Sequence, residues 1–190
     1  MSILAGFTVM LLVEPVQAVT ERHVIDPEHL TVGFLVDHMG FAKVSGRFRE
    51  AEGDFDFDET TGEIRNIRVV VKSASVDTTL ETRDRHLRSA DFLNVEEYPE
   101  MVFESRGAKL VDRKATIEGN LSLIGSTRRI RLDVTWNKSG TSPLPGNPYV
   151  TGLSVRGSFR RSEFGMTYGV ADAIVGDEVE LIIELEAHHQ

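Results

Sequence analysis

Apolar and polar residues alternate with a period of two along several segments of this 190-residue chain. Val32, Phe34 and Val36, for example, share one side of an extended segment, and the residues between them share the other. The alternating segments are residues 31–38, 54–58, 67–71, 115–123, 129–136 and 178–186. Successive side chains of a β-strand point to opposite faces, so each segment has one apolar and one polar face. This pattern is typical of an antiparallel sheet with one face in water, and it predicts an all-β protein.

Turn signals separate these segments. Each consists of a glycine beside a polar residue: Glu52-Gly53, Thr61-Gly62, Gly125-Ser126, Ser139-Gly140 and Gly176-Asp177. About eight closely connected strands predict a closed barrel or a sandwich. The length fits one domain or at most two small ones, and the Pro-rich stretch Thr141–Pro148 is interpreted as a long hairpin loop rather than a domain linker.

The first residues have features of an export signal. Residues 3–13 form an apolar run that is too short to span a bilayer, which requires about 20 residues. Val16 and Ala18 are small enough for cleavage by signal peptidase after Ala18. No Lys or Arg precedes the run, so a start upstream of Met1 and a buried N-terminal element are alternatives. We predict a signal peptide over residues 1–18 and one domain over residues 19–190.

Charge and composition exclude several classes of function. The net charge is −9, whereas a nucleic-acid surface needs a basic face, so we expect no nucleic-acid partner. The absence of cysteine excludes a disulfide framework, a thiolate nucleophile and a Cys-based metal site. His29, His38 and His86 offer groups for acid–base chemistry, but no G-x-S-x-G or H-E-x-x-H motif accompanies them. We expect no enzymatic activity, no metal and no cofactor.

One charged segment, RDRHLRSADF (Arg83–Phe92), interrupts the strand pattern. Upstream, Thr78–Glu81 has the Ser/Thr-x-x-Glu pattern of a capping box, which predicts a short helix over about Thr79–Ser89. An isolated helix of this length is marginally stable in water, so it must dock on the rest of the protein. We expect it to dock at an open end of a barrel.

Four segments are similar to those of a known family. They are IDPEHLTVGFLVDHMGFAKVSGRF (Ile25–Phe48), SASVDTTLETRDRHLRSADFLNVEEYPEMVFES (Ser73–Ser105), GNLSLIGSTRRIRLDV (Gly119–Val134) and RRSEFGMTYGVADAIVGDEVELIIELEA (Arg160–Ala187). Together they resemble the YceI-like family of bacterial lipocalin-like proteins. The resemblance implies an eight-stranded antiparallel lipocalin-like barrel with a short helix near its mouth. It also implies a periplasmic protein that binds a polyisoprenoid or a related lipid inside the barrel.

The interior of an eight-stranded barrel is either filled by side chains or holds one small ligand. The chain has ten Phe but one Trp and three Tyr, a set suited to a dry wall around an alkyl or isoprenoid chain. Packing of these side chains on one another as an ordinary core is the alternative. The expected cavity wall is Phe34, Val36, Phe48, Phe55, Phe57, Phe103, Leu121, Leu132 and Val134.

The charged segment has two interpretations. Arg83 and His86 are three residues apart and would face the mouth, where they would bind a pyrophosphate or another polar head group. Alternatively, Arg83, Asp84 and Ser89 tie the helix to the barrel edge and to the loop around Ser162–Met166. The expected residues of the mouth or head-group site are His38, Arg83, His86, Phe92, Phe164 and Met166.

These observations predict a protein that binds, sequesters or transports a long-chain apolar lipid. The expected ligand is an isoprenoid or a fatty chain held in the barrel. The alternative is a periplasmic interaction or stress protein whose barrel is filled and carries no lipid. The sequence leaves open a transient contact with a membrane and a homodimer.

Overall fold

The computed structural model describes residues 20–190. The predicted signal peptide, residues 1–18, lies outside the described residues, as does the first residue of the predicted domain. Within the described part of the chain, no helix is both long enough and apolar enough to cross a membrane. The strands are β1 (Glu21–His38), β2 (Ala42–Phe48), β3 (Ala51–Asp58), β4 (Glu63–Lys72), β5 (Val76–Asp77), β6 (Glu100–Lys109), β7 (Lys114–Leu123), β8 (Ser126–Thr141), β9 (Tyr149–Arg160) and β10 (Val175–His189). The helical segments are η1 (Ser73–Ser75), α1 (Glu81–Arg88) and η2 (Arg161–Phe164).

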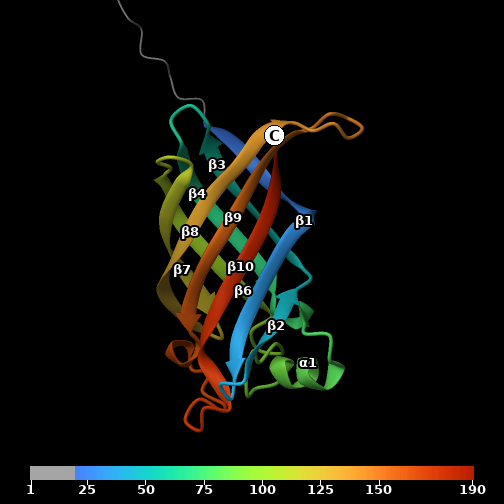
Figure 1. Ribbon diagram of the computed structural model, residues 1–190, viewed down its shortest axis with the longest axis vertical. Helices are drawn as coiled ribbons and strands as arrows, with labels where there is room; N and C mark the ends of the chain where they lie inside the picture. Colours follow the sequence, from blue (N-terminus) through green and yellow to red (C-terminus); the bar gives the residue numbers. More distant parts are fainter. Residues whose placement is uncertain (1–19) are drawn as a thin grey trace, which may run out of the picture.

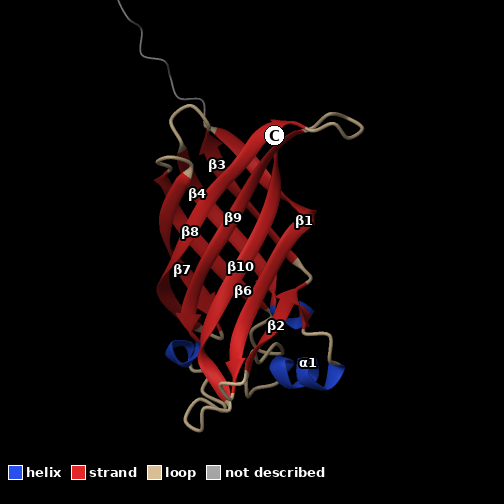
Figure 2. Cartoon of the chain, in the orientation of Figure 1, coloured by secondary structure: helices blue, strands red, loops and turns tan. Residues whose placement is uncertain are grey.

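The strands form one antiparallel sheet that closes on itself (Figures 1 and 2). Along hydrogen-bonded neighbours the ring runs β10–β9–β8–β7–β6–β4–β3–β1, and pairing of β1 with β10 completes it. The result is a closed eight-stranded antiparallel barrel with one short α-helix, which confirms the predicted fold. A closed ring leaves no free edge among its strands, and the alternating side chains point into the barrel or into water.

Two further strands, β2 and β5, extend the wall at the end that carries α1. β1 is long enough to pair with β3 through Glu21–Val24 and with β2 through Val32–His38. β2 and β3 therefore follow one path along β1, interrupted at Arg49–Glu50. β5 (Val76–Asp77) pairs with β2 and so fixes the chain between β4 and α1 to the barrel edge. This pairing positions the helix at one end of the barrel.

The helix forms where it was predicted but begins differently. α1 spans Glu81–Arg88, inside the predicted range, and lies at the end of the barrel (Figure 2). The predicted capping box is wrong, because the residue before the helix is Leu80 and no side chain caps it. Thr78 serves another purpose: its backbone N–H, at 2.9 Å, and its hydroxyl both donate to the buried carboxylate of Asp84. The threonine therefore holds the helix through Asp84 in its first turn.

The end of the barrel opposite α1 is closed by packed side chains. His23 and Phe57 are each 1% exposed there, with ring centroids 5.9 Å apart, and Phe57 packs edge-on against Trp136. A chain of hydrogen bonds crosses this region: Trp136 Nε1 donates to Ser139 Oγ at 2.9 Å, Ser139 pairs with Thr151 at 2.8 Å, and Thr151 lies 3.2 Å from His23 Nε2. Because these buried polar groups have partners, the plug is a satisfied core.

Burial lowers the pKa of His23 from its usual value of 6.5, with desolvation as the main cause. The folded state therefore holds the neutral ring, and stability should fall as the pH drops below about 6.5, where the unfolded chain gains a proton more readily. Replacing His23 with glutamine should remove this dependence. We expect the stability advantage of the wild type over the variant to shrink between about pH 7.5 and about pH 5 in urea denaturation. An advantage that is equal at both pH values would contradict this assignment.

Candidate ligand-binding cavity

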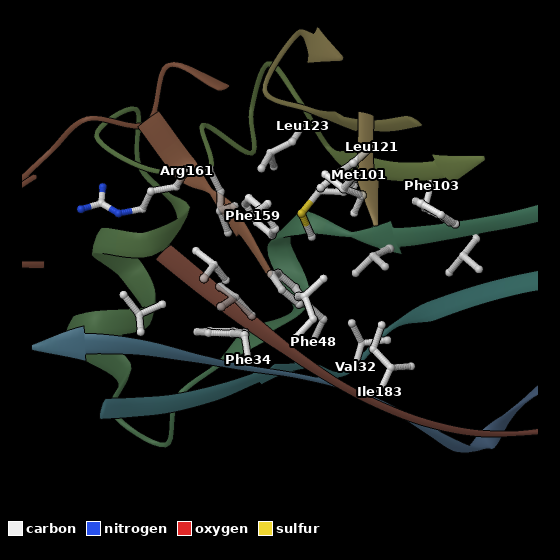
Figure 3. Close-up of a pocket in the computed structure, with 18 of the residues that line it drawn as sticks. Val32, Phe34, Phe48, Met101, Phe103, Leu121, Leu123, Phe159, Arg161 and Ile183 are labelled. Atoms are coloured by element: carbon white, nitrogen blue, oxygen red, sulfur yellow. The ribbon is translucent and has the colours of Figure 1, made fainter. Parts of the chain in front are cut away.

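A cavity of about 460 Å³ lies inside the barrel. Inward side chains from all the ring strands form its wall, and α1 and its flanking segments cover one end. Figure 3 shows Phe34, Phe48, Met101, Leu121 and Phe159 around this space. The volume falls within the range of about 300–1,000 Å³ that is usual for ligand sites. The barrel therefore encloses room for a ligand besides its own core.

The wall is made almost entirely of the alternating apolar faces. Eight of the nine residues predicted for the wall line the cavity: Phe34, Val36, Phe48, Phe55, Phe103, Leu121, Leu132 and Val134. Phe57 does not line it, because its ring belongs to the plug at the closed end against Trp136. The alternation places Phe57 on the inward face correctly, but depth along the barrel decides whether an inward ring meets the cavity or the plug.

Two inward glycines make room for the aromatic rings of the wall. A Cβ on Gly46 would overlap the ring of Phe34, and a Cβ on Gly119 would overlap the ring of Phe103. Both glycines lie at inward strand positions, where a side chain would otherwise occupy the interior. Each ring therefore rests against the backbone of the neighbouring strand, which keeps it at the wall.

The end that carries α1 has a second apolar cluster. Phe92 and Met166, both predicted for the mouth, line the cavity there and are buried. Phe164, also predicted for the mouth, does not line the cavity. Its ring is 2% exposed and packs edge-on against the wall residue Phe159, with centroids 5.3 Å apart. Phe164 therefore packs against the wall residue Phe159 without facing the cavity.

Three rings meet at the mouth. The centroid of His86 lies 5.0 Å from that of Phe92 and 4.8 Å from that of Tyr168, and the last two are 5.3 Å apart. His86 Nε2 also lies 2.9 Å from a carboxylate oxygen of Asp91. His38 lines the cavity on the β1 side. In residues 20–190, no group of three or more His, Asp or Glu side chains is placed to hold a metal ion.

Arg83 lines the cavity, but its guanidinium is already bonded within the protein. Its Nε donates to the hydroxyl of Thr78 and its Nη2 to the carbonyl of Thr78, both at 2.7 Å. Asp84 holds the other side of the same threonine. These contacts favour the interpretation in which Arg83 and Asp84 tie the helix to the barrel edge. The tie is made to Thr78, which follows β5 at the barrel edge, whereas the prediction also included the loop around Ser162–Met166.

Replacing Arg83 with alanine should therefore lower the free energy of unfolding by about 1–2 kcal/mol, because two charge-assisted hydrogen bonds are lost at a partly exposed site. Arg85, whose side chain is 68% exposed, provides the matched control, and its alanine variant should change stability by less than about 0.5 kcal/mol. Chemical denaturation measures both. Unchanged stability of the Arg83 variant would argue against the tie and favour a head-group role.

A buried arginine, Arg161, lies at the mouth and was missed in the predicted site. Its side chain is 1% exposed, and in Figure 3 its guanidinium points away from the apolar side chains in the middle of the cavity. It donates to the carbonyls of Met166, Tyr168, Val175 and Gly176 at 2.7–3.0 Å. Burial lowers its pKa, but an arginine stays charged in proteins. One cation thus joins the start of the loop after η2 to the first residues of β10.

Other lining residues were also missed as members of the site. Leu181 and Ile183 of β10 belong to an apolar face that the alternation had already identified, so the pattern contained the signal. Tyr168 lies in a loop, where no periodicity indicates direction. Arg161 carried no usable signal either, because a charged residue next to Arg160 is normally expected in water.

Comparison with known proteins places the chain in a family. The model of the YceI-like domain matches residues 23–187. Protein YceI of Salmonella arizonae is 35% identical over 190 residues, which cover 98% of this chain and 97% of that protein. The Campylobacter jejuni YCEI crystal structure is 29% identical, covers 81% of this chain and 90% of its own, and has a TM-score of 0.73. A polyisoprenoid binding domain from Saccharophagus degradans shares the fold, at 13% identity and a TM-score of 0.64 over 90% of this chain and 99% of that one. With a matching domain model and a full-length relative, this chain belongs to the YceI-like family.

Proposed function

We propose that this protein binds a long-chain apolar lipid, an isoprenoid or a related chain, in the barrel cavity and carries it. The observation that supports this most directly is the apolar cavity of about 460 Å³ inside the barrel. The structural neighbour described as a polyisoprenoid binding domain has the same fold, which supports a binding function rather than catalysis. A filled barrel that acts only through protein contacts is the competing proposal, and the cavity argues against it.

The free energy of such binding should come mainly from the chain. Each methylene moved from water into the apolar wall contributes ~0.8 kcal/mol. The cations at the mouth are already bonded to the protein, Arg83 to Thr78 and Arg161 to backbone carbonyls. They therefore offer little to a head group. We infer a carrier that accepts several head groups and selects by chain length.

The place of action belongs to the same proposal. We infer that residues 1–18 direct the chain to the periplasm, where an apolar molecule needs a protein to cross water. In that setting the protein would either sequester the lipid or move it between a donor and an acceptor.

Native mass spectrometry of protein purified without detergent tests the proposal, with organic extraction of any bound molecule. We expect a stoichiometric adduct with the mass of an isoprenoid or acyl lipid. A protein that stays free of adducts after incubation with polyprenyl and acyl lipids would favour the filled-barrel alternative.

Chain-length dependence gives a further prediction. In a series of linear saturated alcohols, each added methylene that enters the cavity should lower Kd about threefold to fourfold until the cavity is full. A matched series with alcohol and phosphate ends at one chain length is the control, and it should vary much less. A strong preference for one head group at every chain length would contradict the proposal.

A further inference from the structure

Large apolar side chains protrude into water around the mouth of the cavity. Phe41 is 88% exposed, Leu80 50%, Met39 48%, Tyr168 47% and Ile174 39%. They come from three separate segments: the β1–β2 turn, the residue before α1, and the loop before β10. Figure 1 shows these segments at one end of the barrel. Exposed apolar residues that gather in one region mark an interaction site more often than scattered ones do.

These side chains surround the opening of the cavity. Tyr168 and Ile174 line the cavity and are also exposed, so the cavity reaches solvent between them. His38 lines it immediately before Met39, and Arg83 lines it one turn of helix after Leu80. The protruding groups therefore form a rim, with the dry interior continuing inward from it.

The most exposed of them is held in a fixed position. Met39 and Gly40 have φ of 54° and 69°, and the N–H of Phe41 donates to the carbonyl of His38 at 3.1 Å. Met39, Gly40 and Phe41 form the three-residue loop of this hairpin, between the paired residues His38 and Ala42. Asp37 Oδ1 accepts from the N–H of Gly40 at 2.8 Å and stabilises the turn. Phe41 is thus presented outward by ordered backbone, and little entropy would be lost when it is buried.

We propose that this rim docks on the surface of a phospholipid bilayer, so that the cavity opens directly toward the lipid. The inference rests on the proposed function, because a lipid cargo is the reason for the cavity to face a membrane. A bilayer accepts apolar side chains that project from separate loops, and these side chains come from three separate segments. A second copy of the chain placed on the rim would instead close the cavity on both molecules.

The charges around the rim show whether electrostatic attraction or apolar insertion drives docking. Two cations of the segments at this end, Lys43 and Arg85, lie beside the carboxylates of Glu180 and Glu81, and the whole chain carries a net charge of −9. The rim is therefore not a basic patch that would attract anionic lipids. Docking depends on insertion of apolar side chains and should occur on zwitterionic phosphatidylcholine, with no gain from anionic lipid.

Flotation with phosphatidylcholine vesicles that contain no isoprenoid tests docking by itself. We expect the wild type to float with the vesicles and Phe41→Ser to weaken the partition coefficient by about tenfold or more, since one large aromatic ring no longer inserts. Leu144→Ser is the matched control, because Leu144 is 57% exposed on the β8–β9 loop at the opposite end of the barrel. It should partition like the wild type.

The measurements separate docking from cargo binding. Phe41 does not line the cavity, so its serine variant should keep its lipid adduct in native mass spectrometry and its melting temperature. Lipid adducts without vesicle binding would overturn docking and leave the proposed function standing. Vesicle binding without lipid adducts would overturn the proposed function and leave docking standing. Equal loss in both serine variants, or a dimer in light scattering that Phe41→Ser dissociates, would also overturn docking.

Discussion

Replacing Arg161 with methionine is expected to lower the free energy of unfolding by about 4 kcal/mol. The guanidinium donates four hydrogen bonds to backbone carbonyls, and methionine fills similar space but offers no donor. Removing one partner leaves buried acceptors without hydrogen bonds, which costs more than the bonds themselves contribute in net stability. Because these carbonyls belong to the start of the loop after η2 and to the first residues of β10, the loop should also lose protection in hydrogen exchange.

Arg160 is the matched control for this prediction. It precedes Arg161 directly and is exposed, so Arg160→Met should change the free energy of unfolding by less than about 0.5 kcal/mol. Urea denaturation of both variants gives the comparison. If the two methionine variants were equally stable, the four hydrogen bonds of Arg161 would have no structural importance.

Replacing Leu121 with tryptophan should weaken binding of a long prenol by more than about 100-fold. Leu121 lies in the cavity wall and packs against both the main core of the barrel and the apolar cluster at the mouth. The indole ring of a tryptophan at this position would therefore enter the central space (Figure 3). Displacing about four methylenes of a bound chain would cost ~3 kcal/mol of binding free energy. Titration with a fluorescent prenol measures the change in Kd.

The same variant tests whether the interior has free space. In a cavity, tryptophan occupies room already present, and stability should change by less than about 1 kcal/mol. In a filled core the extra volume would strain the packing by about 1–3 kcal/mol. Leu144→Trp, the same change on an exposed loop at the closed end, should affect neither binding nor stability. A destabilised Leu121 variant with no effect on lipid affinity would favour the filled barrel.

Alternation predicted the barrel well because it reports directly on which face of a strand is buried. The inward face of β10, from Val179 to Leu185, follows the pattern, and every second residue there lines the cavity. Features that depend on partners distant in the sequence were not predictable in this way. The register of β1 against β10 shifts between Ile25 and Leu30, around Pro27, and the alternation does not indicate which strand β1 pairs with on either side of this shift.

Most of the residues predicted for the wall and the mouth line the cavity, whereas Arg161 and Tyr168 at the mouth were not predicted, and the reason is physical. The period-two alternation of the sequence identifies apolar residues of the wall, whereas it does not identify loop residues or buried charges. The capping box at Thr78 failed because the carboxylate of Asp84 competes for the same hydroxyl. Arg161 was not predicted as part of the site, because burial of a cation requires acceptors that only the folded loop brings together.

The packed plug around His23 and Phe57 makes the barrel a tube with a single opening. Lipids can enter and leave such a tube only one at a time, because a bound chain must leave before the next can enter. The end of the chain that entered first also leaves last. A carrier of this shape cannot draw from a donor and deliver to an acceptor at the same time. Transfer between two vesicle populations should therefore follow ping-pong kinetics, with empty protein as an obligatory state between the two encounters.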